Sequence, residues 1–384
     1  MTDVYDYSDR IGRVEPSATL AISNLAAEKE AEGADIVDLS VGEPDFDTPA
    51  NVVEAGKAAL DAGHTGYTSS NGIPALREGI AEKLRGQGVD ATAEEVIVTP
   101  GGKQALYETI GTLVDDGDEV VLLDPAWVSY EAMVKLAGGA LSRVDLAPHG
   151  FQLEPALDDL AEAVSDDTAL LVVNSPSNPT GAVFSETALE GVRDLAVEHD
   201  VAVISDEIYG QIVYDADHVA LASLDGMDDR TVTINGFSKA YSMTGWRLGY
   251  LHATEAFVSQ AGKLHSHSVS CATNFVQHAG VEALEHTDEA VEEMRQAFAD
   301  RRDLLVDLFE EHDVDVDVGE GAFYMMIPVD DDDEAWCERA IEEASVACVP
   351  GTAFNAPGFA RISYAASEER LREAVDRLVT NDLL

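Results

Sequence analysis

The sequence predicts an α/β protein in which a mostly parallel sheet is covered by helices and accompanied by a smaller α+β domain. Through the middle of the chain, short apolar runs rich in β-branched residues alternate with amphipathic stretches, and this alternation ends near residue 285. Alternating strands and helices build a sheet with helices on both faces. The chain has 384 residues and exceeds one typical domain. We therefore predict a large domain at residues 46–285 and a small domain formed by residues 1–45 and 286–384.

The elements of the large domain follow from the spacing of its apolar residues. Short runs of apolar and β-branched residues suit strands that are buried on both faces. Stretches with apolar residues three or four positions apart suit helices that cover the sheet. Such helices are expected at residues 104–114 and 185–199. Such strands are expected at residues 96–99, 119–123, 169–173, 201–205 and 231–235.

The carboxyl-terminal part of the chain has a different pattern, with longer charged stretches and few apolar runs. Ser367 and the two glutamates after it are typical of a helix start, because acidic side chains favour the first turn. The expected elements are a long charged helix at 287–311, a hairpin-like segment at 319–329, a further helix, a strand near 346–349 and a final helix at 367–378.

The charge balance limits the partners of this protein. Seventy-four acidic residues face 23 basic ones, a formal net charge of −51, and such a surface repels nucleic acid. No apolar run approaches the roughly 18 residues of a membrane span, and the first residues lack the pattern of a signal peptide. We expect a cytoplasmic protein adapted to concentrated salt, where the screening length falls to about 3 Å at 1 M. An acidic enzyme from an ordinary cytoplasm is the alternative.

Metal binding is not expected. The three cysteines are Cys271, Cys337 and Cys348, and none belongs to a CxxC pair. Such a sparse, odd set provides neither a disulfide framework nor a zinc site. Small apolar core residues are the simpler interpretation of all three.

Polar residues follow four of the predicted strands, where ligands bind in sheets of this kind. The first strand is followed by Pro-Gly-Gly-Lys at residues 100–103 and then by a helix, whose free N–H groups suit an anion. A plain turn explains this segment equally well. The third strand is followed by residues 174–181, a turn rich in Asn, Pro and Gly that includes Asn178.

The fourth and fifth strands are followed by candidate catalytic residues. Asp206 and Tyr209 have the spacing to contact the nitrogen and the hydroxyl of one ring, although a helix cap beside a half-buried tyrosine explains them as well. Lys239 lies in a turn of small residues, eight positions before Arg247. Burial favours the neutral, nucleophilic form of a lysine, so Lys239 is a candidate to form an imine. A surface lysine is the alternative, although the chain has only seven lysines.

Together these segments resemble the pyridoxal 5′-phosphate (PLP) dependent aminotransferases of fold type I, class I. Their order and spacing are most similar to the bacterial and archaeal aspartate aminotransferase branch. The resemblance spans nearly the whole chain, so the fold type I architecture is implied for all of it. The matching blocks are residues 13–19, 42–49, 67–68, 72–77, 101–106, 124–130, 174–181, 205–209, 238–239, 243–247, 321–324 and 361–365.

The resemblance implies how PLP is bound. Lys239 would hold the cofactor as an imine and later move a proton between substrate and cofactor. Asp206 would keep the pyridine nitrogen protonated, so that the ring accepts electrons. The other implied contacts are Asn178 and Tyr209 at the phenolic oxygen, Trp127 on the ring face, and Gly101, Gly102, Lys103 and Arg247 at the phosphate.

The resemblance also implies the substrate contacts. Arg361 would bind the α-carboxylate, with Asn178, Trp127 and the Gly42 backbone beside it. Gly236 stands where the best-known branch has a phosphate-binding serine, and that branch's second arginine has no clear equivalent here. In the other branch, Lys103, Ser17 and Thr19 would bind the side-chain carboxylate. Pairing of the Lys103 ammonium with the phosphate or with Glu108 is the alternative.

Family members are homodimers in which a tyrosine at the Tyr67 position reaches the partner's phosphate. The implied reaction moves the amino group of L-aspartate, or of another amino acid, to 2-oxoglutarate in a ping-pong cycle. An aromatic, alanine or prephenate aminotransferase is the main alternative, followed by a C–S lyase. A transcription regulator with this domain is disfavoured, because it would need a DNA-binding module and a basic surface.

Overall fold

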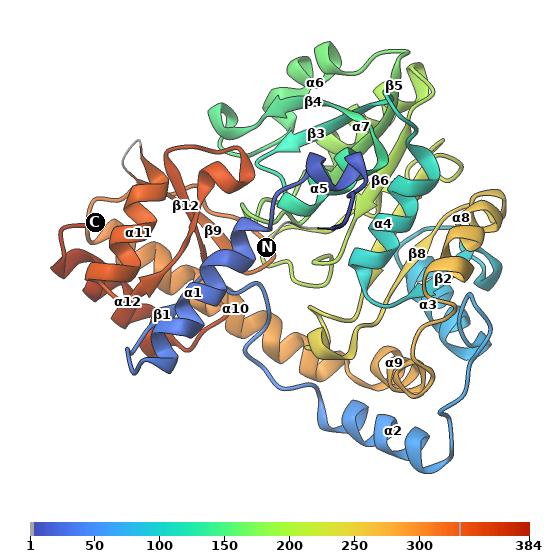
Figure 1. The fold of residues 1–384 in the computed structure, drawn as a ribbon, viewed down its shortest axis with the longest axis horizontal. Helices are drawn as coiled ribbons and strands as arrows, with labels where there is room; N and C mark the ends of the chain where they lie inside the picture. Colours follow the sequence, from blue (N-terminus) through green and yellow to red (C-terminus); the bar gives the residue numbers. More distant parts are fainter. Residues whose placement is uncertain (1–3, 330–331) are drawn as a thin grey trace.

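The computed structural model describes residues 4–329 and 332–384. Its centre is a seven-stranded sheet in the order β2-β8-β7-β6-β5-β3-β4 (Figure 1). β8 runs antiparallel to both neighbours, whereas the other strands share one direction. This arrangement confirms the predicted α/β fold. The strands are β2 (Val96–Thr99), β3 (Glu119–Asp124), β4 (Ala140–Asp145), β5 (Thr168–Asn174), β6 (Ala202–Asp206), β7 (Thr231–Gly236) and β8 (Gly249–His252).

All five predicted strands of this sheet are present, and two further strands were missed. β4 lies at the edge of the sheet, where most of its side chains are exposed or half-buried. Its polar residues therefore gave no apolar run. β8 is buried but consists of only four residues, two of which are Gly249 and His252. Neither strand matches the pattern of a run that is apolar throughout.

Helices cover both faces of the sheet (Figure 1). Successive residues of a strand point to opposite faces, so Ile97 packs toward α4, α5 and α8 while Val96 and Val98 pack toward α2, α3 and α9. α6 and α7 cover the rest of the second face. These helices are α2 (Ala50–Asp61), α3 (Pro74–Gly86), α4 (Gly102–Leu113), α5 (Val128–Ala137), α6 (Leu157–Ala163), α7 (Glu186–Glu198), α8 (Glu255–Ser268) and α9 (Asn274–His286).

The carboxyl-terminal part builds a second group of strands and helices, in which the order of the antiparallel sheet is β11-β12-β9. β1 pairs with β10, so a segment from the start of the chain joins this group, and Figure 1 shows α1 and β1 beside the carboxyl-terminal elements. The division into two domains at residues 45 and 285 stays a prediction. The elements are α1 (Ala18–Ala31), β1 (Val37–Asp38), α10 (Asp288–Glu310), β9 (Tyr324–Pro328), α11 (Asp333–Glu343), β10 (Val346–Ala347), β11 (Val349–Pro350), β12 (Phe359–Ser363) and α12 (Glu368–Thr380).

The predicted hairpin at 319–329 is wrong. Only β9 forms within it, and β9 pairs with β12 rather than with a neighbour in sequence. Gly319 is not a turn residue of a hairpin: a Cβ there would lie 2.6 Å from the backbone carbon of Gly181, so this glycine permits two chain segments to touch. The predicted strand near 346–349 is two short strands in different sheets. The final helix starts as predicted, with the Ser367 hydroxyl accepting from the Arg370 N–H.

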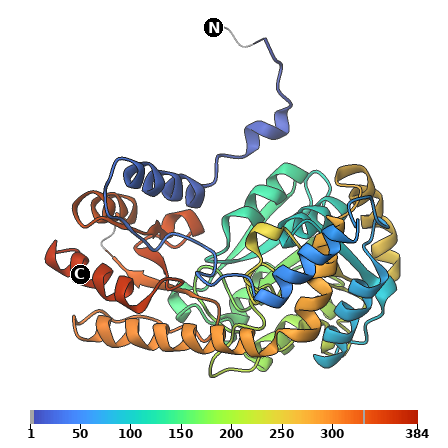
Figure 2. The same cartoon turned by 90° about the horizontal axis from the view of Figure 1, so that it is seen from below.

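The described chain before α1 runs along the outside of the body, and its residues 4–8 project away from it (Figure 2). The short helix η1 (Asp9–Arg13) lies beside α5, where Arg13 Nη2 donates to Asp116 Oδ1 over 3.4 Å. Within residues 4–329 and 332–384, no helix is long and apolar enough to cross a membrane. The same residues contain no cluster of three or more His, Cys, Asp or Glu side chains suited to a metal ion.

Candidate active site

A cavity of about 420 Å³ opens at the carboxyl ends of β5 and β6, beside the turn that follows β7. Its wall combines residues of the central sheet with residues of α1, the segment after β1, β9 and β12. Most of the predicted site residues therefore meet in one place, although they are spread over more than 300 positions of the sequence. Those in the wall are Ser17, Thr19, Gly42, Gly102, Lys103, Trp127, Asn178, Asp206, Tyr209, Lys239, Arg247 and Arg361.

Asp206 places a buried carboxylate in the wall of this cavity. It is the last residue of β6, and Tyr130 Oη donates to its Oδ2 over 2.7 Å, while the Ile208 N–H donates to its Oδ1 over 3.2 Å. Burial raises the pKa of Asp206 to about 6, although the hydrogen bond from Tyr130 opposes this rise. A carboxylate in such surroundings is stabilised by a cation that approaches from the cavity.

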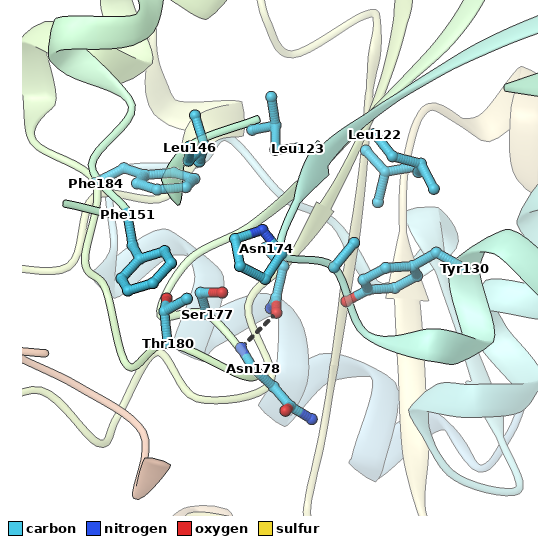
Figure 3. A pocket seen from close by; sticks show the side chains of 13 residues that line it. Leu122, Leu123, Tyr130, Leu146, Phe151, Asn174, Ser177, Asn178, Thr180 and Phe184 are labelled. Carbon is cyan, nitrogen blue, oxygen red and sulfur yellow. Dashed lines mark hydrogen bonds between the residues drawn. The ribbon is translucent and has the colours of Figure 1, made fainter. Parts of the chain in front are cut away.

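Asn178 is fixed by a second asparagine. Its backbone N–H donates to Asn174 Oδ1 over 2.9 Å, and Asn174 Nδ2 donates to the Asp206 carbonyl over 2.9 Å. Figure 3 shows the Asn174–Asn178 bond beside a second pocket, which is lined by Phe151 and Phe184. That pocket has a volume of only about 10 Å³, so it holds no more than a water molecule. The chemistry therefore belongs to the larger cavity.

Arg361 presents a buried guanidinium with spare donors. Its Nη1 donates to Asn178 Oδ1 over 3.1 Å and its Nη2 donates to the Ser40 carbonyl, whereas its Nε is buried without a partner among the described residues. Only 2% of the residue is exposed, and burial lowers its pKa. The guanidinium stacks on Tyr324, 4.6 Å from the ring centroid. A carboxylate in the cavity would satisfy these donors in a bidentate manner.

Lys239 contributes a buried amine to the cavity wall. Its amino group donates to the Gly42 carbonyl and lies 5.6 Å from the centroid of the Tyr209 ring. Burial lowers the pKa of Lys239 to about 8, and the Glu43 carboxylate partly opposes this shift. More of the amine is therefore neutral near pH 7 than in water, as a nucleophile or a general base requires.

An anion site lies at the start of α4. Gly101 has a φ of 86°, which a glycine adopts without strain, and no side chain caps the helix that follows. A Cβ on Gly101 would lie 2.6 Å from Arg247 Nη2, so the guanidinium rests directly against the backbone there. Free N–H groups at a helix start together with a guanidinium suit a phosphate.

The absence of a serine at position 236 has a packing reason. A Cβ on Gly236 would lie 3.0 Å from both the Gly249 Cα and the Leu248 carbonyl oxygen. β7 and β8 are therefore so close at this point that a side chain would require the backbone of β8 to move by a few tenths of an ångström. A phosphate in the cavity would depend on Arg247 and the α4 backbone instead of a hydroxyl from this position.

Lys103 points toward Trp127. Its Nζ lies 4.6 Å from the indole ring centroid, and no ion pair of this lysine occurs in the described part of the chain. The alternative pairing with Glu108 is wrong, since the Glu108 carboxylate accepts from His265 Nδ1 and Gln104 Nε2 instead. Burial lowers the pKa of Lys103, and the nearby Arg247 charge lowers it further.

The sequence profile of the family described as aminotransferase class I and II matches residues 34–378, which is most of the chain. The chain belongs to this family. An aspartate/prephenate aminotransferase of Thermus thermophilus is 43% identical over 96% of this chain and 97% of its own. An aromatic-amino-acid aminotransferase of Thermococcus litoralis is 41% identical over 97% of each chain. The structure of the Thermus thermophilus aspartate aminotransferase with maleate superimposes with a TM-score of 0.95, at 41% identity, over 98% of this chain and 100% of that one.

The cavity of this aminotransferase fits the PLP that its family uses. A phosphate would lie at the start of α4 against Arg247, and the ring would lie beside Trp127 with its nitrogen toward Asp206. Lys239 approaches the same space and has no ion-pair partner among the described residues. A buried carboxylate, an anion cradle and an amine with a lowered pKa are the groups that this cofactor requires.

Tyr130 and Tyr324 line the cavity and lie in the matching blocks, but neither had a predicted role. Tyr130 donates to Asp206, and Tyr324 Oη lies 2.9 Å from Tyr209 Oη. Tyr130 lies almost one helical turn after Trp127, which places both on one side of α5. Their partners lie 76 and 115 positions away in the sequence, so no local pattern reveals these bonds. Tyr67 lies outside the cavity, with 91% of it exposed.

Proposed function

We propose that this aminotransferase binds PLP through Lys239 and transfers the amino group of L-aspartate to 2-oxoglutarate. The observation that carries the substrate assignment is the Lys103 ammonium, which faces the cavity over Trp127 and has no carboxylate partner in the described part of the chain. Relatives from Thermotoga maritima and Geobacillus stearothermophilus that are 40% and 41% identical are named aspartate aminotransferases. Their names support the same assignment.

The cofactor's contribution is to withdraw electrons from the substrate's Cα when it is bound. Asp206 would hold a proton on the ring nitrogen, since an ionised, buried carboxylate favours a cationic partner. The hydroxyl of Tyr209 and the amide of Asn178, which line the same cavity, would bind the phenolic oxygen of the ring. The Lys239 amine would take the proton from the substrate's Cα and deliver it to C4′ of the cofactor, which its lowered pKa favours.

The substrate is held at both ends. Arg361 binds the α-carboxylate, beside the Asn178 amide that it already contacts. At the other end, the Lys103 ammonium binds the side-chain carboxylate. The hydroxyls of Ser17 and Thr19, 2.9 Å apart at the start of α1, line the same cavity and complete this second site. Because the cavity has a cation at each end, it favours substrates with two carboxylates. Aspartate, glutamate and 2-oxoglutarate are such substrates.

Lys103→Ala tests this assignment. A charge-assisted hydrogen bond contributes about 1.5–3 kcal/mol, so kcat/KM for aspartate and glutamate is expected to fall roughly 10- to 150-fold. The values for alanine and phenylalanine should remain nearly unchanged, since neither has a second carboxylate. Lys135→Ala is the matched control, because Lys135 pairs with Glu131 on the outside of α5. Equal losses for acidic and neutral substrates would instead assign Lys103 to the cofactor.

The response to different amino donors distinguishes the proposed aspartate aminotransferase from the alternative enzymes. When aspartate is added without an acceptor, an aminotransferase converts one equivalent of bound cofactor and stops. A C–S lyase of this fold, given its sulfur-containing amino acid, instead releases pyruvate continuously. The relatives named as prephenate and aromatic aminotransferases make those substrates the second candidates. Half-reaction spectra with aspartate, phenylalanine, alanine and glutamate rank the donors directly. A faster reaction with phenylalanine than with aspartate would overturn the aspartate assignment.

We further propose a cytoplasmic homodimer in which Tyr67 completes the site of the other subunit. The exposure of Tyr67 and its position outside its own cavity support this proposal. Tyr67→Ala is expected to lower activity roughly 10- to 150-fold, as loss of one charge-assisted hydrogen bond would.

Mixing Tyr67→Ala with an inactive Lys239→Ala variant tests the sharing of residues between subunits. Hybrid dimers contain one site with both native residues, so a refolded equimolar mixture should regain about one quarter of the wild-type activity. Subunits mixed without dissociation provide the control. Activity equal to the average of the two parents would contradict a shared site.

A further inference from the structure

A buried carboxylate and imidazole lie beside the turn at residues 207–210, which follows Asp206 at the end of β6 and is called the cofactor turn below. Glu207 follows Asp206 in the sequence, is only 1% exposed, and does not line the cavity. The His218 side chain is 7% exposed, and its Nε2 lies 3.1 Å from Glu207 Oε2. Burying such a pair is unfavourable unless its polar atoms are satisfied, so a specific role is expected for it.

The Glu207 carboxylate is bound from three sides. Besides the imidazole, the Ser205 hydroxyl donates to Oε1 over 2.9 Å, and the Leu221 N–H donates to Oε1 over 3.3 Å. The Glu207 backbone is equally fixed: its N–H donates to the Ile234 carbonyl over 2.9 Å, and its carbonyl accepts from the Gly210 N–H over 2.8 Å. Residue 207 is therefore anchored by its side chain and by both backbone groups.

The imidazole also packs against the turn itself. A Cβ on Gly210 would lie 2.8 Å from His218 Nε2, so the ring touches the backbone at the end of the turn. Asp206 precedes this turn and Tyr209 lies within it, and both side chains face the cavity. Any shift of the turn moves both of these groups at once.

We propose that Glu207 and His218 are positioning residues that set the Asp206 carboxylate and the Tyr209 hydroxyl for the cofactor ring. This inference rests on the proposed binding of PLP in the cavity. Neither residue touches the cavity, so each acts through the turn at residues 207–210. Errors of about 1 Å in such groups lower rates by about 100-fold.

The test compares His218→Leu, which removes the donor to Glu207, with His218→Gln, which retains an N–H donor. His199→Leu is the matched control, because His199 pairs with Asp166 over 2.7 Å at the end of α7 and away from the cavity. The measurements are the dissociation constant of PLP from the apoprotein, the absorbance spectrum of the bound cofactor, and kcat and KM for the amino donor.

We expect His218→Leu to weaken PLP binding about tenfold, to shift the cofactor spectrum, and to lower kcat about 10- to 100-fold with KM changed less than about twofold. KM is largely retained because Arg361 and Lys103 are unaffected. His218→Gln should restore most of each loss, and His199→Leu should match the wild type. A lower melting temperature with unchanged PLP affinity and spectrum would overturn the proposal and leave a purely structural pair.

If His218→Leu does not fold, the same cofactor measurements are made on Glu207→Gln, which keeps the size of the side chain and removes its charge. Wild-type PLP affinity and spectrum in a folded Glu207→Gln protein would overturn the proposal. The cofactor measurements need no substrate, so a preference for another amino donor would contradict only the aspartate assignment. A wild-type protein that does not bind PLP would overturn both the proposed function and this inference.

Discussion

Lys239→Ala is expected to lower turnover by more than about 10³-fold while PLP still binds without a covalent bond. In the proposed function the amine is both the attachment point and the group that moves the proton, so its loss would remove two contributions at once. Arg247, Asp206 and Trp127 line the cavity and are unchanged in this variant. The phosphate and ring contacts proposed for them would therefore retain non-covalent binding. Absorbance of the bound cofactor and single-turnover rates with aspartate measure the two effects separately.

Borohydride reduction followed by peptide mapping identifies the attachment point in the wild-type protein. Lys83 is the natural comparison, because burial lowers its pKa to about 8 as well. It does not line the cavity; its Nζ bonds to Gln211. We expect the label on Lys239 alone. A label on any other lysine would refute the assignment of Lys239. A label on Lys83 would further show that a lowered pKa, rather than a position in the cavity, selects the lysine that reacts with the cofactor.

The melting temperature is expected to rise by about 10 °C or more between 0.1 M and 3 M KCl. With a net charge of −51, acidic side chains repel one another across the surface of the folded state, and salt screens this repulsion. Activity should fall in dilute buffer and recover in part when PLP is added, since the cofactor binds the folded protein alone.

Circular dichroism across a salt series measures this effect. A neutral osmolyte at equal osmolality is the control, because it lowers water activity without screening charge. A melting temperature that stays constant from 0.1 to 3 M KCl would refute adaptation to salt. It would also support the simpler interpretation of an acidic enzyme from an ordinary cytoplasm.

The fold and most of the site were predictable because their signals are local. Each of the five strands is a short run rich in apolar and β-branched residues, and the residues that end or follow it are placed at the same edge of the sheet by the shared strand direction. Asp206 and Lys239 were found in this way, and the structure brings them into one cavity. β4 was missed because an edge strand needs no continuous apolar run, and β8 because it is short and contains glycine and histidine.

The sequence by itself determined the alternation of strands and helices, the extreme negative charge and the family, because each is expressed by residue types or by close neighbours in the chain. Only the tertiary structure decided which groups meet: Tyr130 with Asp206, Glu108 with His265 instead of Lys103, and the pair of Glu207 and His218 behind the cofactor turn. The physical reason is that two of these contacts join residues 76 and 157 positions apart, and the third joins residues 11 positions apart across an irregular segment without periodic pattern. Their distances depend on how the helices and sheets pack, and local periodicity carries no information about that packing.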